Sequence, residues 1–289
     1  MGKPLSAQES KGLVRDVAER VRFRLVMSSA AHRLRSMSNS RRMLPAYLIV
    51  GTQKGGTTFL HSILSQHPQV RDPLKKEINY FSFQHFRGEP WYRAHFPLRA
   101  AGLVTGEATT NYMFHPGAAE RIASLLPDAK IIVCLRDPAG RALSHWQMNM
   151  LNKHDSVPFA EAIEREDERT AGEIERIAAD PTYQAWPFRR FSYRRRGLYL
   201  DQILRLERCF PKEQILVIDS GDLFRRTDET LARAESFLGL RGWKPAAYRA
   251  ENVAKRKEPV HEESVEALRS FYRPHDEALF EHLGWSPRW

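Results

Sequence analysis

The sequence predicts an α/β fold of three layers, in which a central parallel sheet is flanked by helices. Short apolar runs typical of buried strands alternate along the chain with segments of helical spacing. Helices between strands imply parallel crossovers, which cover both faces of a sheet. The chain has 289 residues, 42% of them hydrophobic and 28% charged, and this is enough to bury one sizeable core.

The expected elements follow one another from Pro45, which marks the start of the domain. Pro127 ends one expected helix, and Pro138 suits the first turn of the next. A charged helix is expected over 158–179, where Glu and Arg recur at spacings that allow pairs four residues apart. The other expected helices are 57–66, 118–126, 138–150, 198–209 and 227–238, and the expected strands are 46–50, 103–105, 130–135 and 214–218.

Residues 1–43 look separate from the domain, which we place at 44–289. Apolar residues recur there at helical spacing with arginines between them, which predicts a basic amphipathic helix followed by a linker. Such a helix either packs on the domain or touches a membrane surface or a partner. The apolar positions are Val14, Val17, Val21 and Leu25.

The segment 152–196 breaks the alternation of strands and helices. Its second half mixes aromatic residues with arginines, and such a mixture can stack on sugars or bases and bind anions. It is either a loop whose aromatic residues anchor it to the core or a flexible lid on the substrate side. The residues are Tyr183, Trp186, Phe188, Arg189, Arg190, Phe191, Tyr193, Arg194, Arg195 and Arg196.

Composition narrows the compartment and the partners. The net charge of +10 fits a solvated basic surface or an anionic ligand, such as a phosphorylated nucleotide, an acidic glycan, nucleic acid or an anionic membrane. The two cysteines, Cys134 and Cys209, can form neither a disulfide framework nor a metal site. Without a secretory signal or a membrane-length apolar run, we expect a cytoplasmic protein, with a peripheral membrane location left open.

A glycine-rich turn follows the first expected strand, within Tyr47–Leu60. Glycines let backbone N–H groups approach a phosphate, and a helix N-terminus adds a favourable dipole. Gly51 and Gly56 match the spacing of the ATP-binding pattern G-x-x-x-x-G-K-[ST], but Thr57 replaces its lysine. The lysine lies inside the loop instead, at Lys54. This P-loop-like turn therefore predicts a phosphate-bearing donor other than ATP.

Two motifs together resemble those of sulfotransferases that use 3′-phosphoadenylyl sulfate (PAPS). The loop from Gly51 to Thr58 is similar to the 5′-phosphosulfate loop of that family. The segment Ile131–Trp146 is similar to its 3′-phosphate motif, in which an arginine at a strand end and a serine in the next helix bind the phosphate. The corresponding residues here are Arg136 and Ser144.

The resemblance covers most of Pro45–Trp289 and points to the heparan-sulfate-type and related bacterial branch. Lys75–Phe81 resembles the K-E-x-x-(Y/F)-F segment of that branch, whose glutamate is the proposed catalytic base. Three further segments also resemble it: Pro211–Ile218, Phe237–Leu240 and His282–Trp285.

The resemblance implies transfer of a sulfuryl group from PAPS to an acceptor hydroxyl, on a carbohydrate or a small metabolite, with release of adenosine 3′,5′-bisphosphate. Negative charge grows on the departing oxygen, and a lysine with backbone amides can stabilise it. An attacking hydroxyl must lose its proton, and Glu77 is the candidate base. A metal is not expected, because the leaving group is no triphosphate. The donor-loop candidates are Lys54, Gly55, Gly56, Thr57 and Thr58.

Other candidate residues bind the nucleotide or the acceptor. Arg136 can hold a phosphate with its guanidinium fork, helped by the Ser144 hydroxyl. His145, beside it, is expected to be a structural or surface histidine. The segment Lys255–Lys257 lies where the family has a lysine–glycine–arginine loop over the nucleotide, but the glycine is absent. The candidates there are Lys255, Arg256 and Lys257.

The segment Glu107–Tyr112 falls where heparan-type enzymes have a Glu-Lys-(Ser/Thr) motif that contacts the acceptor. Ala108 replaces the lysine, which weakens an assignment to glycosaminoglycans and leaves other acidic acceptors open. The candidate acceptor-side residues are Lys76, Glu107, Thr109 and Tyr112.

Two other functions stay open. The Gly51–Gly56 spacing suits a P-loop kinase, although the lysine after Gly56 and a convincing metal-binding aspartate are missing. The positive charge and the arginine–aromatic mixture suit a non-catalytic binder of nucleic acid or of an anionic surface, whose affinity would depend steeply on salt. For the sulfotransferase, no nucleic-acid partner is expected.

Overall fold

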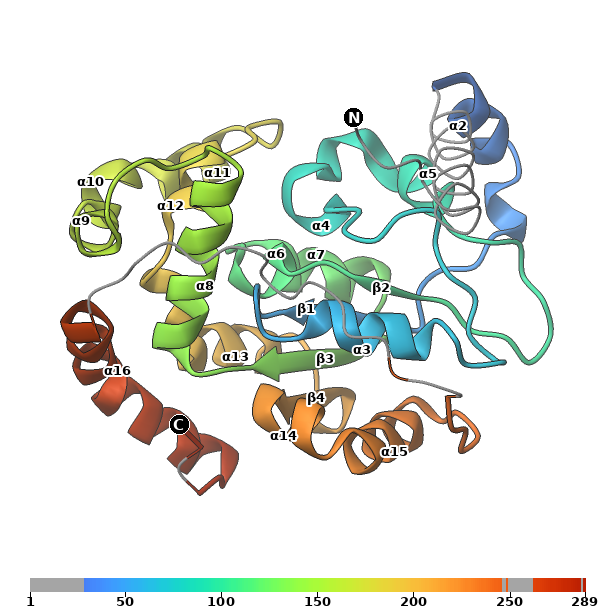
Figure 1. Ribbon diagram of the computed structural model, residues 1–289. Helices are drawn as coiled ribbons and strands as arrows, with labels where there is room; N and C mark the ends of the chain where they lie inside the picture. Colours follow the sequence, from blue (N-terminus) through green and yellow to red (C-terminus); the bar gives the residue numbers. More distant parts are fainter. Residues whose placement is uncertain (1–28, 246–247, 249–261, 287) are drawn as a thin grey trace, which may run out of the picture.

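A parallel sheet of four strands lies between layers of helices in the computed structural model, which describes residues 29–245, 248, 262–286 and 288–289 (Figure 1). The strand order is β2-β1-β3-β4, and each neighbouring pair is parallel. The predicted fold class is therefore confirmed. The strands are β1 (Tyr47–Gly51), β2 (Gly106–Ala108), β3 (Lys130–Leu135) and β4 (Ile215–Asp219).

Helices connect the strands and extend beyond them. Those that pack directly on the sheet or follow its strands are α3 (Thr57–Leu64), α6 (Asn111–Phe114), α7 (Ala118–Leu125), α8 (Pro138–Leu151), α13 (Tyr199–Glu207), α14 (Ser220–Arg225) and α15 (Thr227–Leu238). The others in the described part of the chain are α2 (Ser29–Ser36), α4 (Tyr80–Phe83), α5 (Gly88–Arg93), α9 (Phe159–Glu164), α10 (Glu166–Arg169), α11 (Glu173–Ala179), α12 (Trp186–Phe191) and α16 (Glu262–Leu283).

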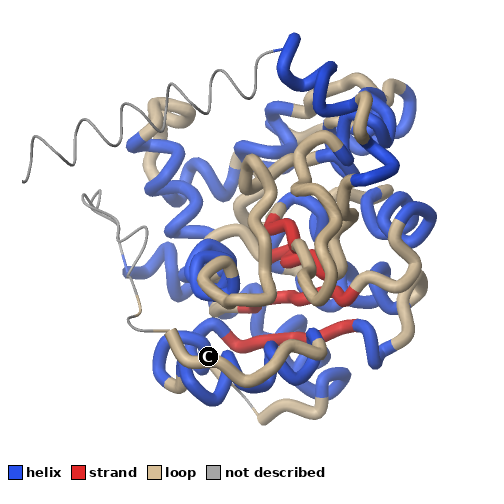
Figure 2. Tube along the Cα trace, turned by 90° about the vertical axis from the view of Figure 1, so that its right-hand side faces the viewer, coloured by secondary structure: helices blue, strands red, loops and turns tan. Residues whose placement is uncertain are grey.

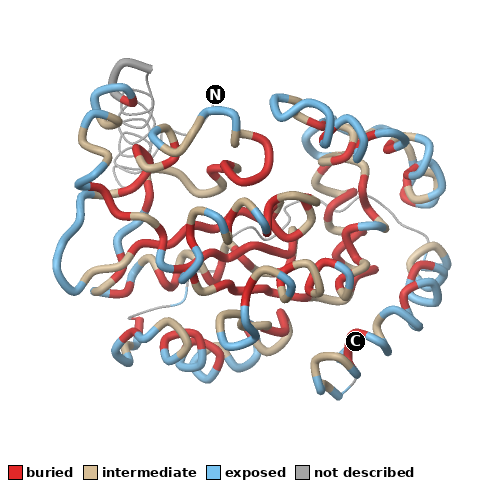
Figure 3. Tube along the Cα trace, turned by 180° about the vertical axis from the view of Figure 1, so that it is seen from behind, coloured by how far each residue is buried: buried red, intermediate tan, exposed pale blue. Residues whose placement is uncertain are grey.

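Successive residues of each strand point to opposite faces of the sheet, and both faces are buried. Leu48 and Ile131 belong to one apolar cluster, which includes residues of α7 and α13. Ile49 and Ile132 belong to the cluster on the other face, with residues of α3, α14 and α15. Figure 2 shows the strands enclosed by helices, and in Figure 3 buried residues concentrate along the sheet. Burial of both faces is typical of parallel sheets.

Most predicted elements lie within two residues of the observed ones, namely β1, β3, β4, α3, α7, α8, α13 and α15. The strand predicted over 103–105 is wrong, because β2 covers Gly106–Ala108. It pairs with β1 at Gly106, where a Cβ would lie 2.1 Å from the ring of Tyr47, so the packing of this ring against β2 requires glycine.

The single helix predicted over 158–179 is also wrong. The segment forms three short helices, α9, α10 and α11, in its place. Gly172 precedes α11 with a φ of 71°, a left-handed conformation that ends any continuous helix there. The pairs four residues apart exist only locally, as in the ion pair of Arg165 with Glu161 at 3.1 Å.

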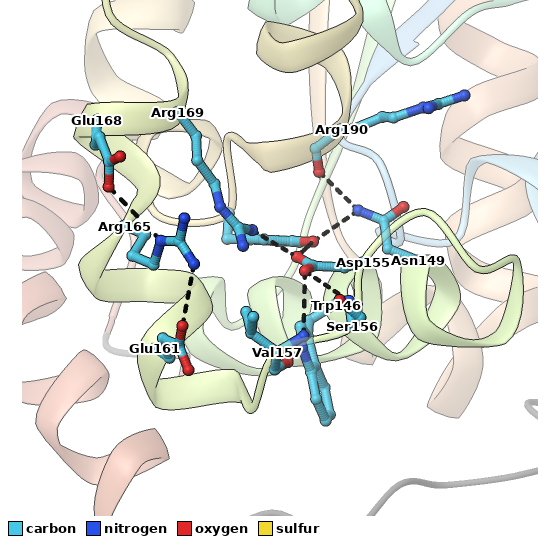
Figure 4. A network of polar contacts seen from close by, with 11 residues as sticks. Trp146, Asn149, Asp155, Ser156, Val157, Glu161, Arg165, Glu168, Arg169 and Arg190 are labelled. Carbon is cyan, nitrogen blue, oxygen red and sulfur yellow. Dashed lines mark hydrogen bonds and ion pairs between the residues drawn. The ribbon is translucent and has the colours of Figure 1, made fainter.

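The segment 152–196 packs on α8, as its polar contacts show (Figure 4). Asp155 accepts hydrogen bonds from Arg169 at 2.9 Å and from the Tyr193 hydroxyl at 2.7 Å. Asn149 of α8 donates to the carbonyl of Arg190 at 2.7 Å. Burial alone would raise the pKa of Asp155, but the bonds from Tyr193, the Ser156 amide and Arg169 outweigh it and lower the pKa. The Tyr193 hydroxyl also accepts from the Asn149 side chain at 2.8 Å, so this tyrosine helps to hold the segment on α8.

Helix α2 is joined to the domain through α5 and the residues that follow it. Arg35 donates to the carbonyl oxygens of Ala94 at 2.7 Å and Phe96 at 3.0 Å, and Arg42 donates to Phe96 at 2.8 Å. The amphipathic helix predicted around Val14–Leu25 lies outside the described residues. Among the helices of the described ranges, none combines the length and the apolar character needed to cross a bilayer.

Candidate functional site

The loop after β1 folds back against the end of β3. The Thr52 amide donates to the carbonyl of Cys134 at 2.8 Å, and the Gly55 amide donates to the carbonyl of Thr52 at 2.9 Å. A Cβ on Gly55 would lie 2.5 Å from the Cys134 oxygen, so only glycine fits there. Lys54 and Gly56 have left-handed φ values of 69° and 90°. The loop leads directly into α3, whose first amides have no partner within the helix and can bind an anion.

Arg136 follows β3 and reaches this loop. Its Nη1 donates to the carbonyl of Lys54 at 3.3 Å, and its own carbonyl accepts from the Tyr199 hydroxyl at 2.9 Å. The side chain of Asp137 then caps α8 by accepting from the amides of its first turn. Ser144 is half-buried on the same helix. Both predicted phosphate motifs therefore lie at the carboxyl ends of adjacent strands, where ligands of α/β sheets bind.

Lys54 and Arg136 place two positive charges at this edge of the sheet. Burial, and then the charge of Arg136, lower the pKa of Lys54. Among the described residues, no carboxylate forms an ion pair with either side chain. A bound anion would offset the cost of burying the Lys54 charge and the repulsion between the two cations. The arrangement therefore suits an anionic ligand.

Glu77 lies beside the end of β2. Its amide donates to the carbonyl of Ala108 at 3.0 Å, and its φ of 60° is left-handed, as is that of Asn79. Its carboxylate accepts from the Thr110 hydroxyl at 3.5 Å. The side chain is 41% exposed, so an incoming group can reach the carboxylate.

Lys76 connects Glu77 to the donor loop. Its Nζ donates to the hydroxyl oxygen of Thr58 at 2.8 Å and lies 3.5 Å from Oε1 of Glu77. A ligand on the loop and a group beside the carboxylate would therefore meet at this lysine.

Glu107, Thr109 and Tyr112 lie beneath the Glu77 loop. They are 0%, 0% and 1% exposed. The Glu107 carboxylate accepts hydrogen bonds from the hydroxyls of Thr109 at 2.6 Å, Tyr92 at 2.7 Å and Tyr112 at 2.7 Å. Burial raises its pKa, and these bonds oppose the increase.

The hydroxyl of Tyr112 also accepts a hydrogen bond from the backbone N–H of Tyr80 at 2.9 Å. The hydroxyl of Thr109 accepts one from the backbone N–H of Asn79 at 3.5 Å. The buried Glu107 group thus holds the backbone that follows Glu77. We propose this supporting role in place of the contact with acceptor expected from the sequence.

Two arginines of the segment 152–196 come close to Glu77. Burial, the larger effect, lowers the pKa of Arg189 and lowers that of Arg196 to about 9, and the negative charge of Glu77 opposes both changes. The sequence indicates these arginines only as part of the aromatic mixture. The sequence motifs assign no role to Asn79 and Asn111, which connect Arg196 to Glu77. Asparagine at a left-handed φ is a weak signal for Asn79, because asparagine tolerates that conformation best among non-glycine residues.

The candidate residues that remain are a basic segment and a histidine. Lys255, Arg256 and Lys257 lie outside the described residues. His145 is buried, and burial with the charges of Arg141 and Arg196 keeps its pKa well below the usual range. In the described part of the chain, no group of three His, Cys, Asp or Glu side chains is placed to hold a metal ion.

A cationic loop after β1, an arginine after β3 and a carboxylate beside β2 form a P-loop-like site that suits a phosphate-bearing ligand. A family model described as the sulfotransferase domain matches residues 44–269, and the chain belongs to this family.

Curated relatives and a solved structure agree with this assignment. The membrane-associated sulfotransferase kil1 of Dictyostelium discoideum is 27% identical, over 85% of this chain and 66% of its own length. The human heparan sulfate glucosamine 3-O-sulfotransferase 3B1 is 30% identical, over 86% of this chain and 65% of its own length. The chain thus spans slightly less than two thirds of the length of these relatives.

A sulfotransferase from Alicyclobacillus acidocaldarius has a similar structure. The TM-score is 0.68 at 29% identity, covering 84% of this chain and 97% of that one.

Proposed function

We propose that the protein transfers a sulfuryl group from PAPS to an acceptor hydroxyl on a carbohydrate or a small metabolite. The observation that supports this best is the contact of Lys76 with both Thr58 and Glu77, at 2.8 Å and 3.5 Å. It joins a phosphate-type loop to an exposed carboxylate, and sulfuryl transfer needs both at one place.

The donor occupies the loop between β1 and α3. Lys54 and the amides of residues 55–58 stabilise the charge that develops on the bridging oxygen as it leaves. Arg136 and Ser144 bind the 3′-phosphate. The guanidinium group of Arg136 suits this role because it is positively charged and can donate two parallel hydrogen bonds to a phosphate. The basic residues at 255–257 contribute to nucleotide binding in this proposal. No metal takes part.

The acceptor lies beside Glu77. Its oxygen forms a bond to sulfur in line with the bond that breaks, between sulfur and the oxygen of the 5′-phosphate. The hydroxyl proton passes to the Glu77 carboxylate, and the electron pair of the broken bond leaves with adenosine 3′,5′-bisphosphate. Lys76 contacts both Thr58 at the donor loop and Glu77, so its positive charge can stabilise the negative charge of the transition state.

The carbohydrate class of acceptor is supported by the name of the human relative, which acts on heparan sulfate glucosamine. The chain also offers Trp186, which is half-exposed and has two arginines nearby, with guanidinium carbons 4.3 Å (Arg189) and 4.8 Å (Arg190) from its ring centroid. Such a group can stack on a sugar. We place the protein in the cytoplasm, with its basic N-terminal segment against a membrane surface or a partner.

Labelled PAPS tests this function. Lys54→Ala should reduce label transfer to acceptor mixtures by about 100-fold or more, because one leaving-group contact is lost. The melting temperature should stay the same. Lys212→Ala, an exposed lysine in the turn before β4, is the matched control. Unchanged turnover of Lys54→Ala would contradict the proposal.

Binding measurements separate the alternatives. Calorimetry should show binding of adenosine 3′,5′-bisphosphate without Mg²⁺. Binding of ATP that requires Mg²⁺ would support a kinase in its place. Salt-sensitive binding of nucleic acid, without binding of the bisphosphate, would support a nucleic-acid binder.

A further inference from the structure

Three polar side chains from distant parts of the chain form a continuous hydrogen-bonded row behind Glu77. Arg196 donates through Nη2 to the side-chain oxygen of Asn111 at 3.0 Å. The Asn111 amide nitrogen donates to the side-chain oxygen of Asn79 at 2.8 Å. The Asn79 amide nitrogen donates to the backbone carbonyl of Glu77 at 2.9 Å. We call these three residues, Arg196, Asn111 and Asn79, the asparagine row.

The arginine at the end of the row is firmly held. Arg196 is 2% exposed, and its Nη2 also donates to the carbonyl of Arg189 at 3.3 Å. Its guanidinium carbon lies 4.4 Å from the ring centroid of Phe114, which stacks on Phe188 at 4.3 Å. Asn111 and Phe114 both belong to the single turn of α6, so one short helix fixes both the group and its hydrogen bond.

The arginine also sets the direction of the row. A guanidinium can only donate, so Asn111 must turn its oxygen toward Arg196 and its nitrogen toward Asn79. Asn79 must then present its oxygen to Asn111, which leaves its nitrogen to donate to the carbonyl of Glu77. That carbonyl can only accept. Every member therefore has the one orientation that satisfies all three bonds.

Glu77 needs such support because its backbone is unfavourable by itself. Both Glu77 and Asn79 have a φ of 60°, in the left-handed region that side chains other than asparagine and glycine seldom adopt. Such conformations persist only where surrounding contacts over-determine them. The buried group around Glu107 holds the amides of Asn79 and Tyr80 from below, and the asparagine row holds the Glu77 carbonyl from the side.

We propose that Asn111 and Arg196 are positioning residues, which fix the Glu77 carboxylate through Asn79. The inference rests on the proposed function, because it treats Glu77 as the base. It gives the segment 152–196 a part in the reaction beyond covering the site, since Arg196 ends that segment. Neither residue touches the acceptor in this proposal.

Asn111→Asp tests the direction of the row with little change in volume. A carboxylate at 111 keeps the bond to Arg196, whose Nε and Nη1 have no other partner in the described structure and can bind it too, so the variant should fold. It cannot donate to Asn79. Asn79 must then rotate and turn its oxygen to the Glu77 carbonyl, which loses its bond. We expect kcat to fall by about 10- to 100-fold, with the KM for PAPS and the affinity for adenosine 3′,5′-bisphosphate unchanged.

The control is Asn152→Asp, which adds the same charge at an exposed position after α8 and should keep full activity. A kcat of Asn111→Asp equal to that of the control would overturn the proposal. So would an equal loss of nucleotide affinity, because the damage would then extend beyond Glu77.

A double substitution separates positioning from general damage. If Asn111→Asp acts through Glu77, it should reduce the residual turnover of Glu77→Gln no further. A multiplicative loss in the double variant would show an independent structural effect and overturn the proposal. Full activity of Glu77→Gln would remove the base and the positioning role together. Loss in Glu77→Gln with normal Asn111→Asp would leave the base assignment intact and contradict the positioning role alone.

Arg196→Lys gives a second test that keeps a donor-only group. Lysine preserves the direction of the row, because its one nitrogen can only donate, so it should retain more kcat than Arg196→Met, which has no donor. Equal kcat values for the two variants, at equal melting temperatures, would contradict the proposal.

Discussion

Nη1 of Arg136 lies 3.3 Å from the carbonyl oxygen of Lys54, so the loops that follow β1 and β3 are directly joined. One arginine therefore belongs to both candidate phosphate sites, because its backbone follows β3 and its side chain contacts the loop after β1. A change at Arg136 should therefore affect both ends of the bound nucleotide.

Arg136→Ala should weaken binding of adenosine 3′,5′-bisphosphate by about 1.5–3 kcal/mol, which is the range for a hydrogen bond to a charged group, and Arg136→Lys should lie between it and the wild type. Titration calorimetry measures this directly. Arg208→Ala, an exposed arginine after α13, should bind as the wild type does. An unchanged dissociation constant for Arg136→Ala would remove this residue from the nucleotide site.

Gly55→Ala should lower the free energy of unfolding by about 1–3 kcal/mol, because its Cβ would lie 2.5 Å from a backbone oxygen of β3 that cannot move aside easily. Nucleotide affinity should fall as well, since the loop must shift. Gly242→Ala, where nothing lies within 4 Å of the added Cβ, serves as the comparison in urea unfolding. Equal stability of the two variants would show that the loop adapts.

Tyr112→Phe and Tyr92→Phe should both reduce the free energy of unfolding, each by about 1–3 kcal/mol, because each removes a buried hydrogen bond to Glu107. Only Tyr112 also accepts the Tyr80 amide, so only Tyr112→Phe should lower kcat. Steady-state kinetics beside chemical denaturation distinguishes the two. Equal kcat values for Tyr112→Phe and Tyr92→Phe would mean that the buried Glu107 group does not position the Glu77 loop.

Asp276 should make the stability of the protein fall as the pH rises from about 4 to about 7. Burial, with a contribution from the charge of Asp137, raises the pKa of Asp276 to about 7 against the hydrogen bond from Trp289. The folded protein then binds this proton more tightly than the unfolded chain, whose carboxyl pKa is about 3.9. The free energy of unfolding must therefore decrease across that range and level off above it.

Asp276→Asn cannot ionise and should lose this dependence, so its stability relative to the wild type should increase between about pH 4 and pH 7. Urea unfolding at several pH values measures the difference and cancels the contributions of buried histidines. Parallel profiles for the two proteins would contradict the raised pKa.

The positions of the loops after β1 and β3 could be predicted from the sequence, because each depends on a local succession of elements. A strand, a glycine turn and a helix follow one another between Tyr47 and Leu64, so spacing alone places Lys54 at the strand end. Arg136 follows its strand in the same way, and parallel strands bring both loops to one edge.

The acceptor side could not be predicted as fully, because it depends on contacts between distant segments. Asn111 and Arg196 are 85 residues apart and meet only once the segment 152–196 packs on α8. Strand β2 contains Gly106 and a buried glutamate, so it lacks the apolar pattern by which strands are recognised. Helix α16 is missing from the predicted elements, and Pro274 within it interrupts the usual signals of a continuous helix.

Lys54 and Glu77 are held in place by contacts with different strands, so the site consists of two structurally separate parts. The loops after β1 and β3 hold the donor residues, whereas Glu77 is bound to β2 through Ala108 and to the segment 152–196 through Asn79. In the proposed reaction, changes around β2 and 152–196 should therefore alter the choice of acceptor, while the loops after β1 and β3 keep their contacts. Lys76 contacts both parts, so a change in the position of one part affects the other through this lysine.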